Sequence, residues 1–226
     1  GGKLKTMAEK RNIPVFSFDY KAQPRAALPF CFLPILGFLQ KLGFVNDKSA
    51  DMAEMVHTLN QLSSKINDGV PSSQNPAKQL AQRLYGHLPV LYGAGIVSEV
   101  AHRWKTQFNE NSKAWAFYEA FPELNHNAVV GYQFPPELAS KIVVVLLRSN
   151  LLHQRILLRY RVTCQLLKQA KVDYQIVDGD GSSSLSQMMS LVLFGDYVSY
   201  YLAILYQIDP SPVKTIDYLK KQLAKG

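Results

Sequence analysis

The sequence predicts an α/β protein in which a mainly parallel sheet lies between two layers of helices, with helical segments leading into it at the N-terminus. Three observations support this fold class. Short runs are apolar at nearly every position, which is typical of strands buried on both faces. Helical segments separate these runs, as parallel pairing requires. Of the 226 residues, 47% are apolar, which is enough to bury one sizeable core.

The first third of the chain is mostly helical. Residues 3–11 suggest the last turns of a helix, and the β-rich run 13–18 follows, so the chain is expected to open within an αβ unit. Apolar residues predict helices over 26–44 and 51–66, and the stretch 67–76 (NDGVPSSQNP) is the clearest loop. We therefore expect three parts: a domain remnant over 1–22, a helical connecting segment over 23–76 and the α/β domain over 77–226.

Strands and helices then alternate. The predicted elements are, in order, a helix over 77–85, a strand over 88–92, a helix over 97–108, a strand over 141–147, a helix over 154–169, a strand over 172–177, and helices over 185–207 and 212–223. The run 191–208 carries Asp196 and several tyrosines, and the run 29–39 is too short and contains two prolines. Neither stretch predicts a membrane span.

The net charge of +8 suits an anionic partner such as nucleic acid, an acidic membrane surface or a phosphorylated metabolite. The basic segment 148–171 is the nucleic-acid candidate. Its charges alternate with leucines, and no aromatic platform accompanies them, so an amphipathic helix that covers the sheet is favoured. We predict no nucleic-acid and no membrane partner.

The two cysteines, Cys31 and Cys164, lie in apolar, helix-like segments 133 positions apart, with no CxxC motif. This spacing does not predict a structural zinc site. Buried thiols in a chain without a signal peptide are typical of a reducing compartment, and we expect a cytoplasmic protein.

Gly93 and Gly95 follow the strand over 88–92 and precede a helix. Backbone N–H groups at such a helix start can bind a phosphate. The pair lacks the third glycine of a dinucleotide site and the GK[ST] of a P-loop. A plain tight turn explains it as well.

Three further residues are candidates for chemistry. Glu110 closes a predicted helix, where the helix dipole disfavours a carboxylate, although a solvated glutamate in a polar turn is the simple alternative. His126 lies between Asn125 and Asn127, which could orient its ring or simply cap a short helix. Arg25 follows a proline and is either an anion donor or an ordinary first-turn residue.

These residues lie in blocks that resemble the C-terminal part of the bifunctional phosphoglucose/phosphomannose isomerases, members of the sugar isomerase (SIS) domain superfamily. The resemblance covers nearly the whole chain. It is carried by the sequences 23–28 (QPRAAL), 92–95 (YGAG), 109–113 (NENSK), 122–127 (PELNHN), 195–202 (GDYVSYYL), 209–213 (DPSPV) and 216–220 (IDYLK). The blocks NEN and ELNHN at this separation are specific, whereas the YGAG turn is not.

The resemblance implies reversible interconversion of a phosphorylated aldose with fructose 6-phosphate, without a metal or redox cofactor. Glu110 matches the base that moves a proton between C1 and C2, and Arg25 matches the arginine near the enediolate oxygen. His126 matches the ring-opening histidine that a partner subunit contributes in a dimer, and Lys220, or Lys221 if the register differs, matches the assisting lysine. The residues expected to contact substrate are Gly93, Gly95 and Ser211.

One departure from the family pattern matters for activity. The family has two SIS domains, and the Ser/Thr-rich loop that holds the sugar phosphate belongs to the first, of which only a remnant precedes residue 24. Because remote phosphate binding helps to position the reacting carbons, we expect this chain alone to be a poor catalyst. The alternatives are a catalytically silent sugar-phosphate-binding or regulatory SIS domain and a basic nucleic-acid-associated protein.

Overall fold

The structure, a computed structural model, describes residues 2–225 and forms two compact units. The first unit ends at Lys48 and the second begins at Ser49. The first contains the helices α1 (Gly2–Lys10) and α2 (Leu28–Lys41) and a 3₁₀ turn, η1 (Pro24–Ala26). The predicted helices over 3–11 and 26–44 are thus present, although the second begins only after η1.

The β-rich run 13–18 is not a strand, so that expectation was wrong. A strand needs a partner for its backbone groups, and within residues 2–225 no strand pairs with this run. Its aromatic side chains pack within the first unit instead. Phe16 meets Phe38 edge-on with ring centroids 5.7 Å apart, and Phe18 stacks on Phe30 at 5.6 Å. Packing against α2 satisfies these side chains without a sheet.

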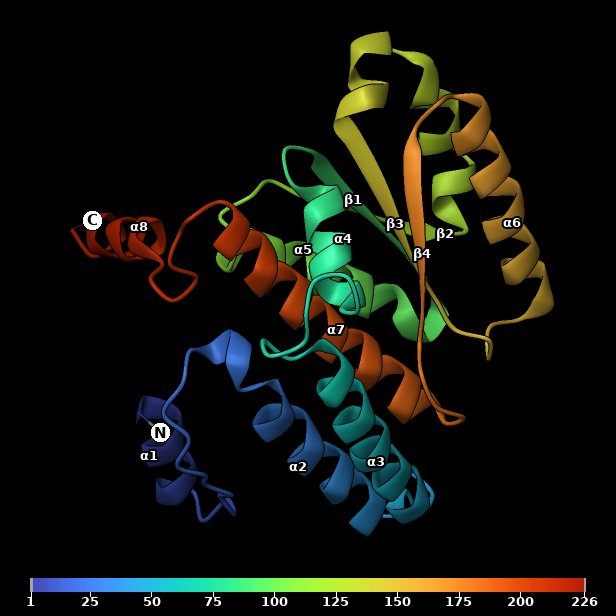
Figure 1. The fold of residues 1–226 in the computed structure, drawn as a ribbon. Coiled ribbons are helices and arrows are strands. Elements are labelled where there is room, and N and C mark those ends of the chain that lie inside the picture. The colour runs from blue at the N-terminus through green and yellow to red at the C-terminus, as the bar shows by residue number, and fades with distance from the viewer. Residues whose placement is uncertain (1, 226) are drawn as a thin grey trace. The chain divides into compact units, whose positions relative to one another are not determined.

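The second unit carries the alternating pattern (Figure 1). Its helices are α3 (Ser49–Ile66), α4 (Pro76–Leu84), α5 (Ser98–Glu110), α6 (Gln154–Gln169), α7 (Ser184–Leu205) and α8 (Lys214–Leu223). Its strands are β1 (Leu88–Ala94), β2 (Phe117–Phe121), β3 (Ile142–Arg148) and β4 (Asp173–Asp178). Short 3₁₀ helices between β2 and β3 are η3 (Glu123–Asn125), η4 (Ala128–Gln133) and η5 (Pro136–Lys141).

Strand β2 was not predicted from the sequence. This strand lies at an edge of the sheet, pairs only with β1, and is only partly buried. An edge strand need not be apolar throughout, and Glu119 in its centre hides the signal. The other three strands match the predicted runs within a few residues.

The four strands form one parallel sheet in the order β2-β1-β3-β4. Leu91 lies opposite Tyr118 on one side and Val145 on the other. The strand order reverses between β1 and β3, and ligands of open parallel sheets commonly bind beyond the carboxyl ends of strands at such a reversal.

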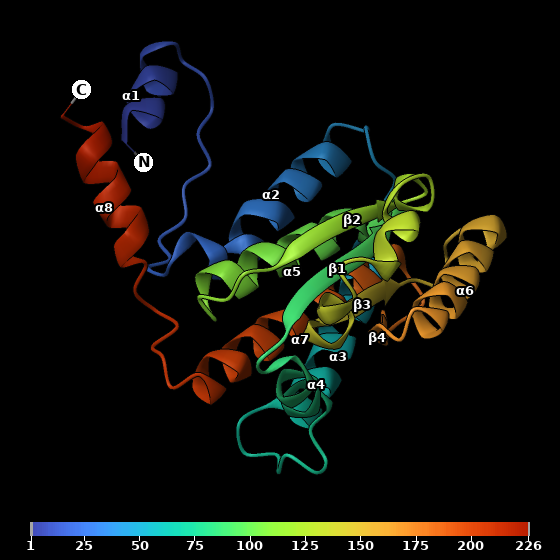
Figure 2. The ribbon, with the colours of Figure 1, turned by 90° about the horizontal axis from the view of Figure 1, so that it is seen from above.

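Helices cover both faces of this sheet, which confirms the predicted α/β/α sandwich (Figures 1 and 2). On one face, Val144 and Leu146 of β3 pack in a buried cluster with Tyr160, Cys164 and Leu167 of α6. On the other face, α5 packs on β1 and α7 packs on α3, α4 and α5.

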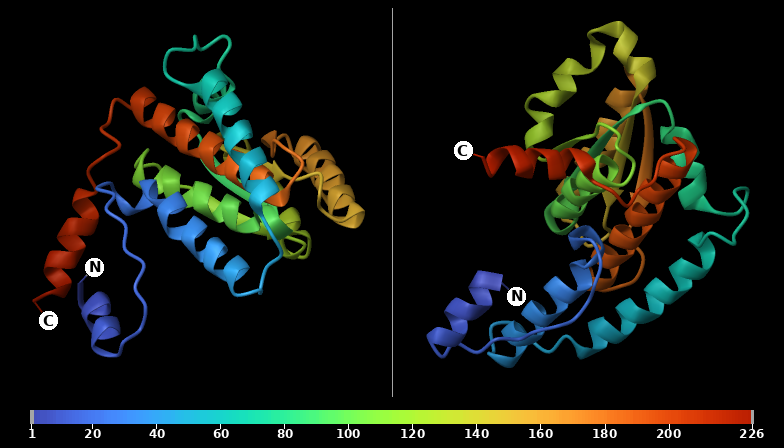
Figure 3. Two further views of the ribbon diagram at one scale, coloured as in Figure 1. Left: turned by 90° about the horizontal axis from the view of Figure 1, so that it is seen from below. Right: turned by 90° about the vertical axis from the view of Figure 1, so that its left-hand side faces the viewer.

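Helix α7 lies at the centre of the helices on the face of the sheet that α5 covers. Figure 3 shows it beside α3. By length and composition this helix could cross a membrane, but more than half of the relevant window is buried inside the protein. Its apolar character is accounted for by its central place in the core.

Candidate active site

Helix α5 ends at Glu110, as the sequence predicts, and this residue is half-buried. The ammonium group of Lys113 donates to the carbonyl oxygen of Glu110 and, at 3.0 Å, to that of Pro210. A cation beside the last turn of a helix offsets the partial negative charge of its carbonyl groups. The position that looked unfavourable for a carboxylate therefore has a positive charge close by.

The residues that follow Glu110 are tied to α7. The side-chain amide of Asn111 donates to Ser199 Oγ at 2.9 Å, and Ser112 Oγ donates to the carbonyl oxygen of Ser199 at 2.6 Å. Ser112 and Ser199 are both buried. Since buried hydrogen bonds are costly to break, the backbone at Glu110 is held in place by α7.

Three further contacts fix α5 along its length. Trp104 Nε1 donates to the carbonyl oxygen of Leu191 at 2.8 Å. Gln107 Nε2 donates to Asp196 Oδ1 at 2.6 Å, and the guanidinium of Arg103 lies 3.2 Å from both oxygens of the same carboxylate. Burial raises the pKa of Asp196, and Arg103 and Gln107 act against that rise. These contacts join the block 195–202 to the helix that leads into the NEN block.

The turn that carries Ser211 lies beside the end of α5. Lys113 links the two, because it bonds both to Glu110 and to Pro210. The backbone N–H of Ser211 donates to Asp209 Oδ1 at 2.8 Å, which lowers the pKa of Asp209. Of the predicted site residues, Glu110 and Ser211 are therefore brought together.

Lys220 is exposed on α8, a helix with no buried residue. The described part of the chain gives its ammonium group no polar partner. Lys221 is exposed as well, so burial does not choose between the two lysines. The ring-opening role of either remains a prediction.

His126 follows β2 at a fixed backbone position. Leu124 is fully buried in the core. The side chain of Asn125 donates to Thr163 Oγ1 at 2.9 Å and accepts from Arg159 Nη1 at 3.2 Å. Asn127 caps η4 by accepting from the N–H of Ala128, one of the two capping roles considered from sequence. The neighbours of His126 are thus anchored, while its own side chain is exposed.

Glu110 and His126 lie on opposite ends of the sheet. Glu110 precedes the amino end of β2, and His126 follows its carboxyl end. Five residues of strand span roughly 16 Å at about 3.3 Å per residue. The fold of a single chain therefore does not bring these two groups together.

Gly93 and Gly95 are also far from Glu110, since α5 runs back along the sheet from the carboxyl end of β1. A Cβ on Gly93 would lie 2.7 Å from the carbonyl oxygen of Val97 and 2.8 Å from Ala101 Cβ. Gly95 has a φ of +48°. Close strand–helix packing and a tight turn therefore account for both glycines, and substrate contact remains a prediction.

Arg25 belongs to the first unit, where it is half-buried in η1. Its place beside an enediolate oxygen remains a prediction.

Lys113 lies in the NENSK block, but no role was predicted for it from the sequence. A lysine three residues after a helix-closing glutamate is a usable signal, because cations are favoured at helix C-termini.

Within residues 2–225, no three His, Cys, Asp or Glu side chains gather in a metal-binding group.

A parallel sandwich of this topology, with the blocks anchored as described, is the architecture of an SIS domain protein. The chain belongs to the family described as the bacterial phospho-glucose isomerase C-terminal SIS domain, whose profile matches residues 73–223.

Known proteins support this assignment. The bifunctional phosphoglucose/phosphomannose isomerase of Caldicellulosiruptor bescii is 41% identical over 226 residues, 100% of this chain and 67% of that protein. The protein of the same name from Aquifex aeolicus is 34% identical over 99% of this chain and 66% of its own length. The chain thus spans about two thirds of these relatives. A glucose-6-phosphate isomerase like protein from Thermus thermophilus has the same fold, with a TM-score of 0.65 and 22% identity over 77% of this chain and 57% of that one.

Proposed function

We propose that this chain forms part of an aldose–ketose isomerase that interconverts glucose 6-phosphate, and mannose 6-phosphate, with fructose 6-phosphate through an enediolate. Family membership and the curated relatives of that name support the reaction class. A cytoplasmic place in carbohydrate metabolism fits this substrate. Because the chain spans about two thirds of those relatives, we further propose that a preceding SIS domain supplies the phosphate-binding loop.

In this proposal, the carboxylate of Glu110 removes a proton from C2 and returns it to C1. Negative charge then develops on the substrate oxygens, and Arg25 stabilises it. A carboxylate can serve as such a base only if it is held within hydrogen-bond reach of the reacting protons. His126 and Lys220 assist opening of the sugar ring.

The observation that carries the proposal is the anchoring of Glu110. Its helix is fixed to α7 from Arg103 to Ser112, and Lys113 clamps its carbonyl group. A solvated glutamate in a polar turn would not need these contacts. They hold the backbone at Glu110 in one position, which restricts where its carboxylate can reach, as proton transfer between adjacent carbons demands.

The separation of Glu110 from His126 supports the second element of the proposal, a homodimer. An exposed ring on an anchored backbone is suited to enter the site of a second copy. The site near Glu110 would then receive the partner's histidine, and each dimer would contain two composite sites.

Replacing Glu110 by glutamine in the full-length protein tests the catalytic assignment. A general base contributes typically a hundredfold to ten-thousandfold in rate, so kcat should fall by about that factor while sugar-phosphate affinity changes little. Conversion of glucose 6-phosphate to fructose 6-phosphate is the measurement. Glu99→Gln on the exposed first turn of the same helix is the matched control and should keep full activity.

Other outcomes would choose among the alternatives. Wild-type turnover in Glu110→Gln would remove the assignment. Sugar-phosphate binding without turnover in either form would indicate a silent module. Tight, salt-sensitive binding of nucleic acid that Glu110→Gln leaves unchanged would indicate a nucleic-acid-associated protein.

A further inference from the structure

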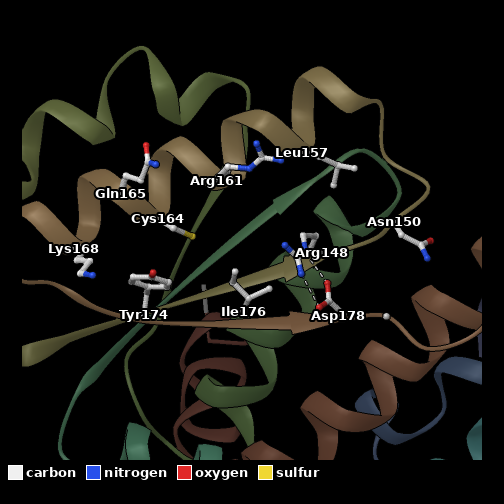
Figure 4. A pocket seen from close by; sticks show the side chains of 11 residues that line it. Arg148, Asn150, Leu157, Arg161, Cys164, Gln165, Lys168, Tyr174, Ile176 and Asp178 are labelled. Atoms are coloured by element: carbon white, nitrogen blue, oxygen red, sulfur yellow. Dashed lines mark hydrogen bonds and ion pairs between the residues drawn. The ribbon is translucent and has the colours of Figure 1, made fainter.

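A cavity lies on the opposite side of the sheet from α5. It is a groove of 710 Å³ between α6 and the edge strand β4 (Figure 4). This volume is in the range of small-molecule sites, about 300–1,000 Å³. Glu110 is not among the residues that line the groove. The groove is therefore separate from the site of the proposed isomerase reaction.

One wall of the groove is cationic. Arg161 and Lys168 stand seven residues apart on α6, which is close to two helical turns, so both side chains lie on the same face. Neither has a polar partner among residues 2–225. Arg148 lies at the end of β3 and uses its Nε and Nη2 on Asp178, which leaves Nη1 as a further donor. Three positive groups and one negative group give the lining a formal charge of +2.

The floor of the groove is largely apolar. Tyr174 and Ile176 of β4 point to the same side of the sheet as Asp178, because side chains alternate along a strand. Burial raises the pKa of the Cys164 thiol, which therefore stays protonated and is a poor nucleophile at neutral pH. The groove thus combines cationic and apolar side chains, and its thiol is not prepared for covalent chemistry.

The cations lie at the two ends of this floor. In Figure 4, Arg161 and Arg148 lie toward one end of the groove, and Lys168 and Tyr174 lie toward the other. Seven residues of helix advance the chain by about 10 Å. This spacing is too long for one phosphate to engage both ends, and it suits a carbon skeleton with an anionic group at each end.

We propose that this groove is a binding site for a phosphorylated metabolite with two anionic groups at opposite ends, such as a sugar bisphosphate. The phosphate at one end would pair with Arg161 and Arg148, where guanidinium groups can form bidentate hydrogen bonds. The other would pair with Lys168, and the carbon chain would lie on Tyr174 and Ile176. The proposal concerns binding only and does not depend on the isomerase reaction.

Isothermal titration calorimetry of the chain with fructose 1,6-bisphosphate tests it. We expect saturable binding at least tenfold tighter than that of inorganic phosphate, which can occupy only one end. Arg161→Gln and Lys168→Gln should each weaken binding at least tenfold. Both residues are exposed, so the variants should fold, and circular dichroism checks this.

One control locates the ligand. Arg155→Gln removes an exposed arginine of α6 that does not line the groove, and it should bind like wild type. No saturable binding to wild type, unchanged binding in Arg161→Gln and Lys168→Gln, or an equal loss of binding in Arg155→Gln would each overturn the proposal.

Discussion

At the scale of single residues, Lys113 holds the backbone at Glu110 against the turn that contains Pro210. It adopts a φ of +52°, in the left-handed region, and from there its ammonium group reaches two carbonyl oxygens. The conformation is uncommon for a residue with a side chain, so the hydrogen bonds it permits are the reason to retain a lysine. The residue joins the end of α5 to the turn before α8.

Lys113→Met should therefore lower the free energy of unfolding by about 1 kcal/mol, since two charge-assisted hydrogen bonds are lost from an exposed site. Urea denaturation measures this loss. Lys171→Met is the matched control, because Lys171 also follows a helix, has a φ of +58° and is exposed. An equal loss in both variants would mean that the hydrogen bonds of Lys113 contribute nothing.

At the scale of elements, the contact between α5 and α7 depends on a glycine. The indole ring of Trp104 lies on Gly195, and a Cβ at that position would lie 2.3 Å from Trp104 Nε1. Trp104 is almost fully buried, so the ring has little room to move. The glycine lets the two helices approach closely enough for Asn111 and Ser112 to reach Ser199.

Gly195→Ala should cost about 3 kcal/mol, at the upper end of what overpacking costs, because the clash is with a buried ring. Thermal unfolding followed by circular dichroism would show it. Gly131→Ala, where a Cβ would meet nothing within 4 Å, should change stability by less than about 0.5 kcal/mol. If Gly195→Ala changed stability as little as Gly131→Ala, the packing of Trp104 against Gly195 would not be tight.

An ion pair joins α4 to β4. Arg83 forms a two-point ion pair with Asp173, with Nε donating to Oδ2 at 2.7 Å. This contact lowers the pKa of Asp173 below its ordinary 3.8. A lowered pKa in the folded state means that the stabilisation is present above the ordinary pKa and is lost as the pH falls through the folded one.

Asp173→Asn should therefore reduce stability at pH 7, by less than about 1 kcal/mol because both partners are partly exposed. The difference from wild type should shrink below about pH 4 and in high salt. Denaturant titrations at several pH values provide the measurement. Arg83→Gln also removes hydrogen bonds to Gln175 Oε1 and to the carbonyl oxygen of Tyr174, so the pair is measured by a double-mutant cycle. Fully additive losses would show that Arg83 and Asp173 are not coupled.

At the scale of the whole molecule, β2 separates two groups that the proposed reaction needs together. Glu110 lies before this strand and His126 after it. A C2 dimer would repeat each surface on both subunits, so a histidine could serve the neighbouring site in both directions.

Mixing the inactive variants Glu110→Gln and His126→Ala in the full-length protein tests this arrangement. Half of the randomly reassembled dimers would be hybrids, each with one intact site, so activity should return to about a quarter of wild type. Each variant alone, taken through the same dissociation and reassembly, is the control. No recovery despite hybrid formation would show that both residues act from one chain.

The sequence by itself determined most of the secondary structure of the second unit. Apolar runs and helical periodicity are local signals, and they located β1, β3, β4 and α6 to within a few residues. The same signals failed at 13–18 and at β2. Whether a run becomes a strand depends on a partner, and no local pattern contains that information.

Only the tertiary structure decided which candidate site residues lie close together. The sequence singled out Glu110, His126, Gly93 and Gly95 as candidate site residues, with His126 expected from a partner subunit. The fold puts Glu110 beside Ser211 and at the other end of the sheet from the remaining three. It also turned the basic face of α6 into the wall of a groove. The reason is physical: spacing along the chain fixes which face a side chain occupies, but packing decides what that face meets.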